Sequence, residues 1–289
     1  MSTIPDKIGK YKIVRPLGSG LMGDVFLGEH STPSGKEFMA IKMLDPKLVI
    51  RRGDAAKFMS EIAHPNFMRY LSIEPVAVGS DKYYIVMDFL EVRPVSRRSL
   101  KTTLSNELLE HFAVVAEGCK MSHDKGVIHG NIKPSNLLIR QAAGKVQPIL
   151  TDWGLDYVFS PDVFVGETFK KTVTYMAPEA AQRFFQGPDS SIKLTPAADI
   201  YSMTQVLLET LIRKQLFRAA GSLDELLALK KNFSVKLLNV NYPKRNVDIK
   251  ALNELITRNM SADPSKRMQD MKQVADAFRA AIVKEAVAL

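Results

Sequence analysis

The chain has 289 residues, of which 46% are hydrophobic, so it exceeds the usual size of a single hydrophobic core and we expect two lobes. Its single cysteine, Cys119, excludes an internal disulfide framework, and no run reaches the about 18 apolar residues of a membrane span, so we expect a cytoplasmic protein. The net charge of +9 arises from scattered basic pairs without interleaved aromatic residues, which disfavours nucleic-acid binding and leaves an acidic protein partner or a solvated surface.

Strand-like segments extend from Tyr11 to about Leu90, with one short helical stretch between them, and helical periodicity dominates the rest of the chain. Residues 18–25 read Gly-Ser-Gly-Leu-Met-Gly-Asp-Val. Glycines at this spacing let backbone N–H groups approach phosphate oxygens, either in a hairpin or at the strand-to-helix turn of a dinucleotide-binding unit. Because residues 11–17 and 25–29 are both rich in β-forming side chains, we predict a hairpin that turns at the glycines.

The next strand contains a lysine. Residues 39–42 read Met-Ala-Ile-Lys and form an apolar strand. We predict a short helix after it, with Asp54 as its N-cap and residues 55–63 as its body. The chain should turn from the β-rich part into the helical part near residues 88–91, directly after the strand of residues 83–87.

Three further motifs lie in the second part of the chain. They read His-Gly-Asn-Ile-Lys-Pro-Ser-Asn-Leu-Leu at residues 129–138, Asp-Trp-Gly at residues 152–154 and Ala-Pro-Glu at residues 177–179. Together with the glycine and lysine strands, they resemble in order and spacing the motifs of protein kinases over nearly the whole chain. The opening of the chain, residues 8–18, resembles the bacterial-type serine/threonine kinases.

This resemblance implies an α+β fold in a single domain of residues 1–289. A small antiparallel β-rich N-lobe, about residues 8–88, would carry one short helix, and a mostly helical C-lobe would cover about residues 92–285. The resemblance further implies that Asp199 is a buried structural residue and that Arg267 pairs with Glu179.

The resemblance implies ATP and magnesium as cofactors. Asn136 and Asp152 would be the two magnesium ligands, since their oxygens are hard donors that suit a cation bridging phosphates. Lys42 would face the α- and β-phosphates. Any apolar residue of the set, taken alone, would equally suit plain core packing, but the set in motif order favours nucleotide contact. The implied nucleotide-binding residues are Gly18, Gly20, Gly23, Val25, Ala40, Lys42, Met87, Asp88, Leu90 and Leu138.

The residue at position 131 departs from the family pattern. Protein kinases have an Asp there, which accepts the proton of the substrate hydroxyl. The carboxamide of Asn131 can hold a hydroxyl but does not take its proton at neutral pH. Lys133 and Thr172 would then remain to orient an acceptor hydroxyl.

The partner of Lys42 is ambiguous in the sequence. In active kinases a Glu of the small-lobe helix pairs with this Lys. Counting forward from Lys42 places Glu61 at the usual distance, whereas counting back from His64-Pro65-Asn66 places the position near Ala55, which has no carboxylate. We favour a broken or rearranged Lys42 pair.

Two other departures affect the acceptor side. Gly130 replaces an Arg that, in many kinases, binds a phosphate on the activation loop, and Lys171 replaces a Gly before Thr172. All these changes damage phosphate transfer to protein, while the nucleotide-facing residues are kept. We therefore predict a pseudokinase, a nucleotide-binding regulatory or scaffold protein with an unidentified protein partner. The alternatives are a slow but active serine/threonine kinase and an interaction scaffold that binds no nucleotide.

Overall fold

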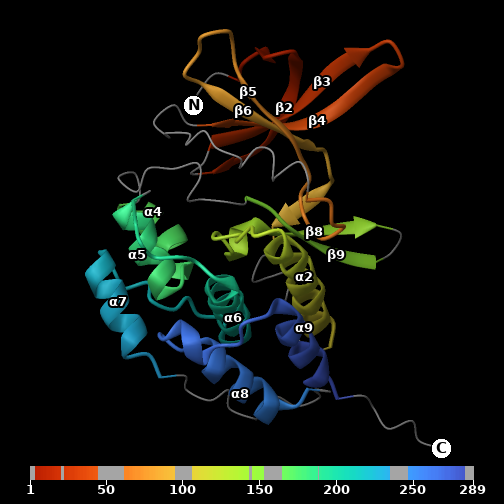
Figure 1. The fold of residues 1–289 in the computed structure, drawn as a ribbon. Helices are drawn as coiled ribbons and strands as arrows, with labels where there is room; N and C mark the ends of the chain where they lie inside the picture. Colours follow the sequence, from red (N-terminus) through yellow and green to blue (C-terminus); the bar gives the residue numbers. More distant parts are fainter. Residues whose placement is uncertain are drawn as a thin grey trace, which may run out of the picture.

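The computed structural model describes residues 4–20, 23–44, 62–94, 106–142, 145–152, 165–187, 189–234 and 247–283. These residues form two lobes, with a sheet of strands above a group of helices in Figure 1. The upper sheet is built from residues before Phe89, and every described α-helix begins after Arg93. The predicted α+β fold, with a β-rich N-lobe and a helical C-lobe, is therefore confirmed.

The N-lobe is one six-stranded antiparallel sheet in the order β1-β2-β3-β4-β6-β5. Side chains alternate between its two faces, so Ile41 and Val86 join a small apolar cluster on one face, while Ala40 and Met87 join the main core on the other. Lys42 lies two residues after Ala40 on the face of the main core. The strands are β1 (Lys7–Ile8), β2 (Tyr11–Gly20), β3 (Gly23–Thr32), β4 (Gly35–Leu44), β5 (Tyr70–Pro75) and β6 (Tyr83–Asp88).

The glycine string forms a hairpin. Gly20 pairs with Gly23 at the end of the β2–β3 ladder, and β3 continues directly from it as a strand. Gly23 has a φ of 121°, and a Cβ there would lie 1.7 Å from the carbonyl oxygen of Met43. Only glycine fits this position. The predicted hairpin is confirmed, and the alternative of a strand-to-helix turn is wrong.

The two lobes are joined by backbone pairing as well as by the chain itself. The main-chain N–H of Met68 donates to Leu150 at 2.8 Å, and the N–H of Leu150 donates to Asn66 at 2.7 Å. The segment before β5 is thereby tied to β9. This strand belongs to a second sheet of β7 (Val92–Pro94), β8 (Leu137–Ala142) and β9 (Lys145–Leu150).

The predicted helix of residues 55–63 falls largely outside the described residues. Its last two predicted positions, Ile62 and Ala63, are described and are not helical, so the predicted end of the helix is wrong. Helix propensity is a weak determinant that tertiary packing overrides, and Ile62 packs into the main core with 3% exposure.

Seven described α-helices build the C-lobe around α6, and most residues of α6 are buried. A helix buried on nearly all sides must pair its polar side chains, and in α6 Nε2 of Gln205 donates to Oε1 of Glu209 at 3.0 Å. Several helices begin at a capping side chain, such as Ser222, Asp248 and Asp270, each of which accepts a backbone N–H. The helices are α2 (Asn106–Asp124), α4 (Gly166–Thr172), α5 (Pro178–Gln186), α6 (Pro196–Ile212), α7 (Leu223–Lys231), α8 (Ile249–Asn259) and α9 (Met271–Ala280), with short 3-10 turns η2 (Pro134–Asn136), η4 (Val173–Tyr175) and η5 (Pro264–Lys266).

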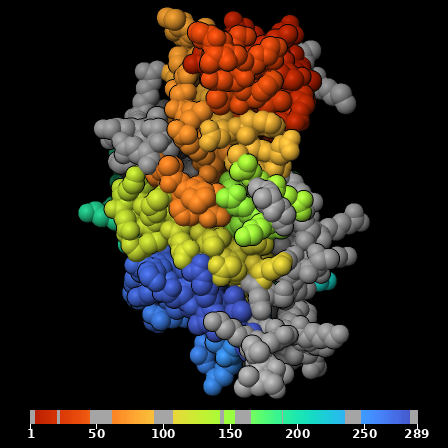
Figure 2. All heavy atoms as spheres, turned by 90° about the vertical axis from the view of Figure 1, so that its right-hand side faces the viewer, coloured from red at the N-terminus to blue at the C-terminus, as the bar shows by residue number. Residues whose placement is uncertain are grey.

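The β8–β9 hairpin and α2 share one face of the molecule, with α9 beneath them (Figure 2). A hollow of about 690 Å³ lies between α2 and β9, lined by His111 and Val114 of the helix and by Val146 and Pro148 of the strand. None of the residues expected to bind nucleotide lines it.

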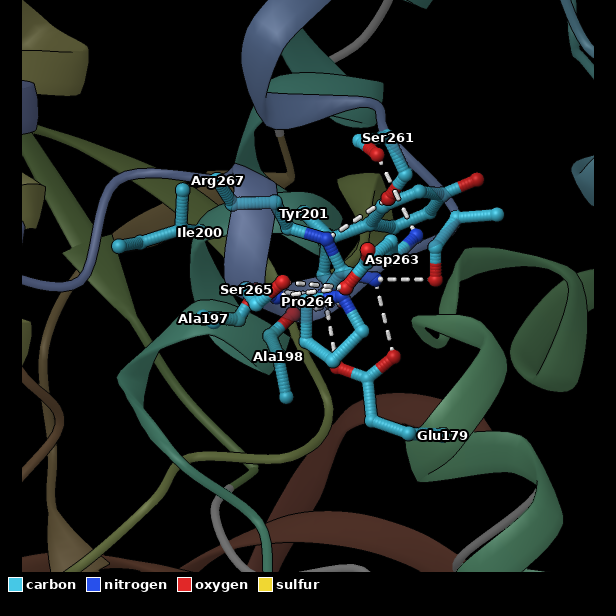
Figure 3. Close-up of polar contacts among 12 residues, drawn as sticks. Glu179, Ala197, Ala198, Ile200, Tyr201, Ser261, Asp263, Pro264, Ser265 and Arg267 are labelled. Atoms are coloured by element: carbon cyan, nitrogen blue, oxygen red, sulfur yellow. Dashed lines mark hydrogen bonds and ion pairs between the residues drawn. The ribbon is translucent and has the colours of Figure 1, made fainter.

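Arg267 forms a buried ion pair that fastens the C-lobe (Figure 3). Its guanidinium donates to both carboxylate oxygens of Glu179, at 2.6 and 2.9 Å. The other donors reach backbone carbonyl oxygens of Ser261, Ala197 and Ala262. All five N–H groups are thus used, as a buried Arg requires. The pairing expected from the Ala-Pro-Glu motif is confirmed, and it links the start of α5 to the end of η5.

We predict that Glu179→Gln lowers the free energy of unfolding by about 3–5 kcal/mol, because it leaves the buried charge of Arg267 without a counter-ion. Urea unfolding measures this change. Arg279→Gln is the matched control, since Arg279 pairs with Glu110 and Glu117 at the surface. Its effect should stay within about 1 kcal/mol. Equal losses in the two variants would contradict the structural role of the buried pair.

Candidate functional site

The centre of the site is an ion pair between the two lobes. Lys42 of β4 places its Nζ 2.7 Å from Oδ1 of Asp152, which lies two residues after β9. The side chains are 6% and 18% exposed, so the pair is largely shielded from water. Burial raises the pKa of Asp152, but Lys42 and then Lys133 outweigh it and hold the pKa below its usual value. Asp152 is therefore an anion at neutral pH.

The predicted catalytic loop lies against Asp152. Asn131 donates its Nδ2–H to the carbonyl oxygen of Asp152 at 2.9 Å, and Asn136 donates its own Nδ2–H to the carbonyl oxygen of Asn131 at 2.9 Å. The structure thus brings Lys42, Asn131, Asn136 and Asp152 into one cluster. A short 3-10 turn at residues 134–136 directs Asn136 back toward the cluster. Pro134 stands at the start of this turn, where a backbone N–H would have no partner within the turn.

Lys133 contacts Thr172, the other residue expected to orient an acceptor hydroxyl. Its Nζ donates to Oγ1 of Thr172 at 2.8 Å, and both residues are buried. Burial lowers the pKa of Lys133 to about 8, with Asp152 acting in the opposite direction. Lys133 and Thr172, which the sequence paired only by resemblance, are therefore in direct contact.

A buried carboxylate holds the loop that precedes Asn131. Asp199 accepts the backbone N–H of His129 at 2.7 Å, that of Gly130 at 2.8 Å, and a contact from Nε2 of His123 at 2.8 Å. Burial raises the pKa of Asp199, but the hydrogen bond and charge of His123 outweigh it, so the pKa is lowered. Burial lowers the pKa of His129 to about 4, which keeps its ring neutral and suits a structural role.

The expected adenine-side residues belong to one apolar cluster. Ala40 and Met87 are buried in the main core and are paired across β4 and β6, while Val25, Leu90 and Leu138 are partly buried against it. Asp88 donates its N–H to the carbonyl oxygen of Arg69 at 3.1 Å. On the glycine hairpin, a Cβ at Gly18 would meet nothing within 4 Å, so open space lies beside the strand there. Gly20 is nearly as open.

The site residues have the donor atoms that a magnesium nucleotide requires. Among the described residues, no side chain or backbone group donates to Oδ2 of Asp152, and Oδ1 of Asn136 accepts only a long contact of 3.3 Å from Ser135. These are hard oxygens, and magnesium typically takes one or two such ligands together with phosphate oxygens. Lys42 adds a cation for the phosphates. The residues present therefore fit the group. Glu61, the other expected partner of Lys42, lies outside the described residues, as do Trp153 and Gly154.

One contact at the site was not expected from the sequence. The hydroxyl of Tyr70, the first residue of β5, accepts the backbone N–H of Asp152 at 2.7 Å. Tyr70 is 3% exposed, and in the sequence an aromatic residue in an apolar strand is typical of plain core. No local sequence pattern shows that the Tyr70 side chain reaches from the N-lobe sheet to Asp152.

The comparison with known families settles the class of the chain. The model described as "Protein kinase domain" matches residues 11–278. The chain belongs to the protein kinase family. In this kinase domain, no helix among the described residues has the length and apolar character needed to cross a membrane.

Serine/threonine kinases of two bacteria are among the similar proteins. The chain is 29% identical over 298 residues to the serine/threonine-protein kinase pkn2 of Myxococcus xanthus, covering 96% of this chain and 33% of that protein. It is 29% identical over 238 residues to PkaA of Streptomyces coelicolor, covering 75% of this chain and 41% of that protein. The chain thus spans about a third to two fifths of these relatives. The crystal structure of the PknI kinase domain of Mycobacterium tuberculosis matches with a TM-score of 0.65 at 19% identity, covering 95% of this chain and 97% of that one, and so shares the fold.

We predict that Gly130→Ala lowers the free energy of unfolding by about 1 kcal/mol or more, because Gly130 has a φ of 71° and a side chain there is strained. A Cβ at this position meets nothing within 4 Å, so no clash confuses the result. Gly221→Ala is the control, since Gly221 has an ordinary φ, and it should stay within about 0.5 kcal/mol. Chemical denaturation of both variants checks the difference, and equal stability would contradict the strain at Gly130.

Proposed function

We propose that this member of the protein kinase family is a pseudokinase, which binds ATP with magnesium and transfers little or no phosphate. The observation that carries the proposal is the contact from Nδ2 of Asn131 to the carbonyl oxygen of Asp152, at 2.9 Å. An ionised Asp has no proton to donate and would set its carboxylate against that carbonyl. Asn131 therefore supports the Asp152 segment at the position where the family motif has its base.

The missing base limits the rate of phosphate transfer. General-base catalysis contributes about 10² to 10⁴ in rate, and kinases turn over at about 1 to 100 per second. A kinase that is intact apart from its base would therefore turn over at roughly 10⁻⁴ to 1 per second. Gly130 further removes the Arg that could bind a phosphate on the activation loop.

Nucleotide binding is supported by the part of the site that is retained. Lys42 and Asp152 form an ion pair, Oδ2 of Asp152 accepts no hydrogen bond from the described residues, and Asn136 is held by its hydrogen bond to Asn131. A family member that had lost its nucleotide would have no functional need for these residues, which argues against a scaffold without nucleotide.

In this proposal the nucleotide acts as a structural ligand. It contacts the glycine hairpin and Lys42 from the N-lobe and Asp152 and Asn136 from the C-lobe, so binding stabilises the arrangement of the lobes by mass action. A partner protein that prefers this arrangement is then bound more tightly when nucleotide is present. The protein would act in the cytoplasm, with a protein as its partner.

A slow serine/threonine kinase is the second candidate. The contact between Lys133 and Thr172 favours it, because it keeps the catalytic loop and the acceptor side together in the absence of a base. Positioning and electrostatics supply most of the catalysis of phosphoryl transfer, so a chain with these features could retain a low rate.

Thermal melting with ATP, in the presence and absence of magnesium, tests the binding part of the proposal. At a nucleotide concentration of 100 times Kd, the stabilisation is about 2.7 kcal/mol, which corresponds to an increase in Tm of roughly 5–10 °C. We expect the full increase in Tm only when magnesium is present, because Asp152 and Asn136 would bind the nucleotide through the metal.

Asp152→Asn is the control for this experiment. The variant keeps the shape of the side chain but loses the charge that binds magnesium, so its Tm should no longer depend on magnesium. If ATP with magnesium leaves the Tm of the unaltered protein unchanged, the proposal is wrong and the scaffold without nucleotide is favoured.

A further inference from the structure

The hydroxyl of Tyr70 lies at the metal-binding end of the site although Tyr70 belongs to the sheet of the other lobe. It accepts the N–H of Asp152 at 2.7 Å and lies 3.4 Å from both Oδ1 of Asp152 and Oγ1 of Thr151. The apolar surroundings of the ring require only an aromatic or aliphatic side chain. The hydroxyl is therefore the part of Tyr70 that the core does not explain.

Asp152 needs external support for its conformation. Its φ of 63° lies in the left-handed region, which L residues other than Gly adopt at a cost. Three side chains hold Asp152. The hydroxyl of Tyr70 accepts a hydrogen bond from its N–H, Asn131 donates to its carbonyl oxygen, and Lys42 pairs with its carboxylate. Among the described residues, Tyr70 supplies the acceptor for the N–H of Asp152.

The position of the Tyr70 ring is fixed from two sides. Its backbone pairs with Met87 in the β5–β6 ladder, beside the expected adenine pocket. The preceding segment is bonded to Leu150 of β9, two residues before Asp152. A side chain held by both the sheet and β9 can set the direction of the residue that follows β9.

We propose that Tyr70 is a positioning residue for the magnesium ligand Asp152. Its hydroxyl keeps Asp152 in the left-handed conformation, in which Oδ1 pairs with Lys42 and Oδ2 is available to the metal. This inference rests on the proposed binding of magnesium nucleotide, and it adds a determinant of metal affinity from outside the family motifs. The backbone of Tyr70 pairs with Met87 on the expected adenine side, and its hydroxyl contacts Asp152 on the metal side, so this one residue links the two sides of the site.

Tyr70→Phe tests the proposal because it removes only the hydroxyl. Calorimetric titration with ATP, with and without magnesium, gives two dissociation constants for each protein. Loss of one buried hydrogen bond corresponds to a weakening of about 10-fold, and we expect it for ATP with magnesium. Without magnesium, the affinity for ATP should stay within about twofold, since Asp152 does not contact phosphate directly.

Tyr84→Phe is the matched control. Tyr84 is also a buried Tyr of the N-lobe sheet, and its hydroxyl donates to Glu74 at 2.6 Å, but it lies in the small cluster on the other face. Its removal should leave the ratio of the two dissociation constants unchanged. A general weakening of the sheet would affect both variants and both constants, whereas the positioning role changes one constant of one variant.

A second measurement does not depend on nucleotide. In the unaltered protein without ligand, the N–H of Asp152 should exchange slowly with solvent, and its exchange should be faster in Tyr70→Phe. Rapid exchange in the unaltered protein, or equal magnesium dependence in the unaltered protein and Tyr70→Phe, would overturn the role of Tyr70. An unaltered protein that binds no ATP with magnesium but protects this N–H would defeat the proposed function and leave the contact of Tyr70 intact.

Discussion

The ion pair between Lys42 and Asp152 is the contact on which the arrangement of the site depends. It joins the N-lobe sheet to the end of β9 across a sequence separation of 110 residues. Both charges are largely shielded from water, and a shielded charge without a partner is costly, so each side chain fixes the other. The contacts of Tyr70, Asn131 and Asn136 all reach Asp152 or the loop beside it, and they lose their geometry if Asp152 turns away.

A second buried carboxylate, that of Asp199, holds the loop that carries Asn131. Asp199 of α6 accepts two successive backbone N–H groups of the loop that carries Asn131, and His123 approaches its other side. These hydrogen bonds use the backbone of the loop, so they hold its shape whichever side chain stands at position 131. This separation explains how a protein of this fold can keep the framework of a kinase and lose the base. The amide of Asn131 donates to the carbonyl oxygen of Asp152, a hydrogen bond that an ionised carboxylate could not make.

The sequence predicted the fold and much of the cluster because these features depend on motifs that are local and ordered along the chain. The glycine hairpin and the turn near Asp88 follow from residue types along the chain, and the pair of Arg267 with Glu179 follows from the resemblance to the kinase motifs. The end of the short helix was placed too late, because local helix propensity does not include the packing of Ile62 into the main core. Tyr70 was missed for a different reason. Its role depends on which way one strand residue points across the junction between the lobes, and that direction is set by the pairing of residues 66–68 with β9.

We propose that the site holds magnesium nucleotide while Asn131 leaves it without effective phosphate transfer. The most direct test is a single-turnover assay with γ-labelled ATP and magnesium, at protein concentrations that bind all of the nucleotide, following label in the protein and in a mixed serine- and threonine-containing acceptor. We predict that most of the ATP stays intact over about ten minutes, so that the rate constant is about 10⁻³ per second or lower, near the slow end of the range left by loss of a general base. Transfer of label at about 1 per second or faster, in the range of active kinases, would contradict the account.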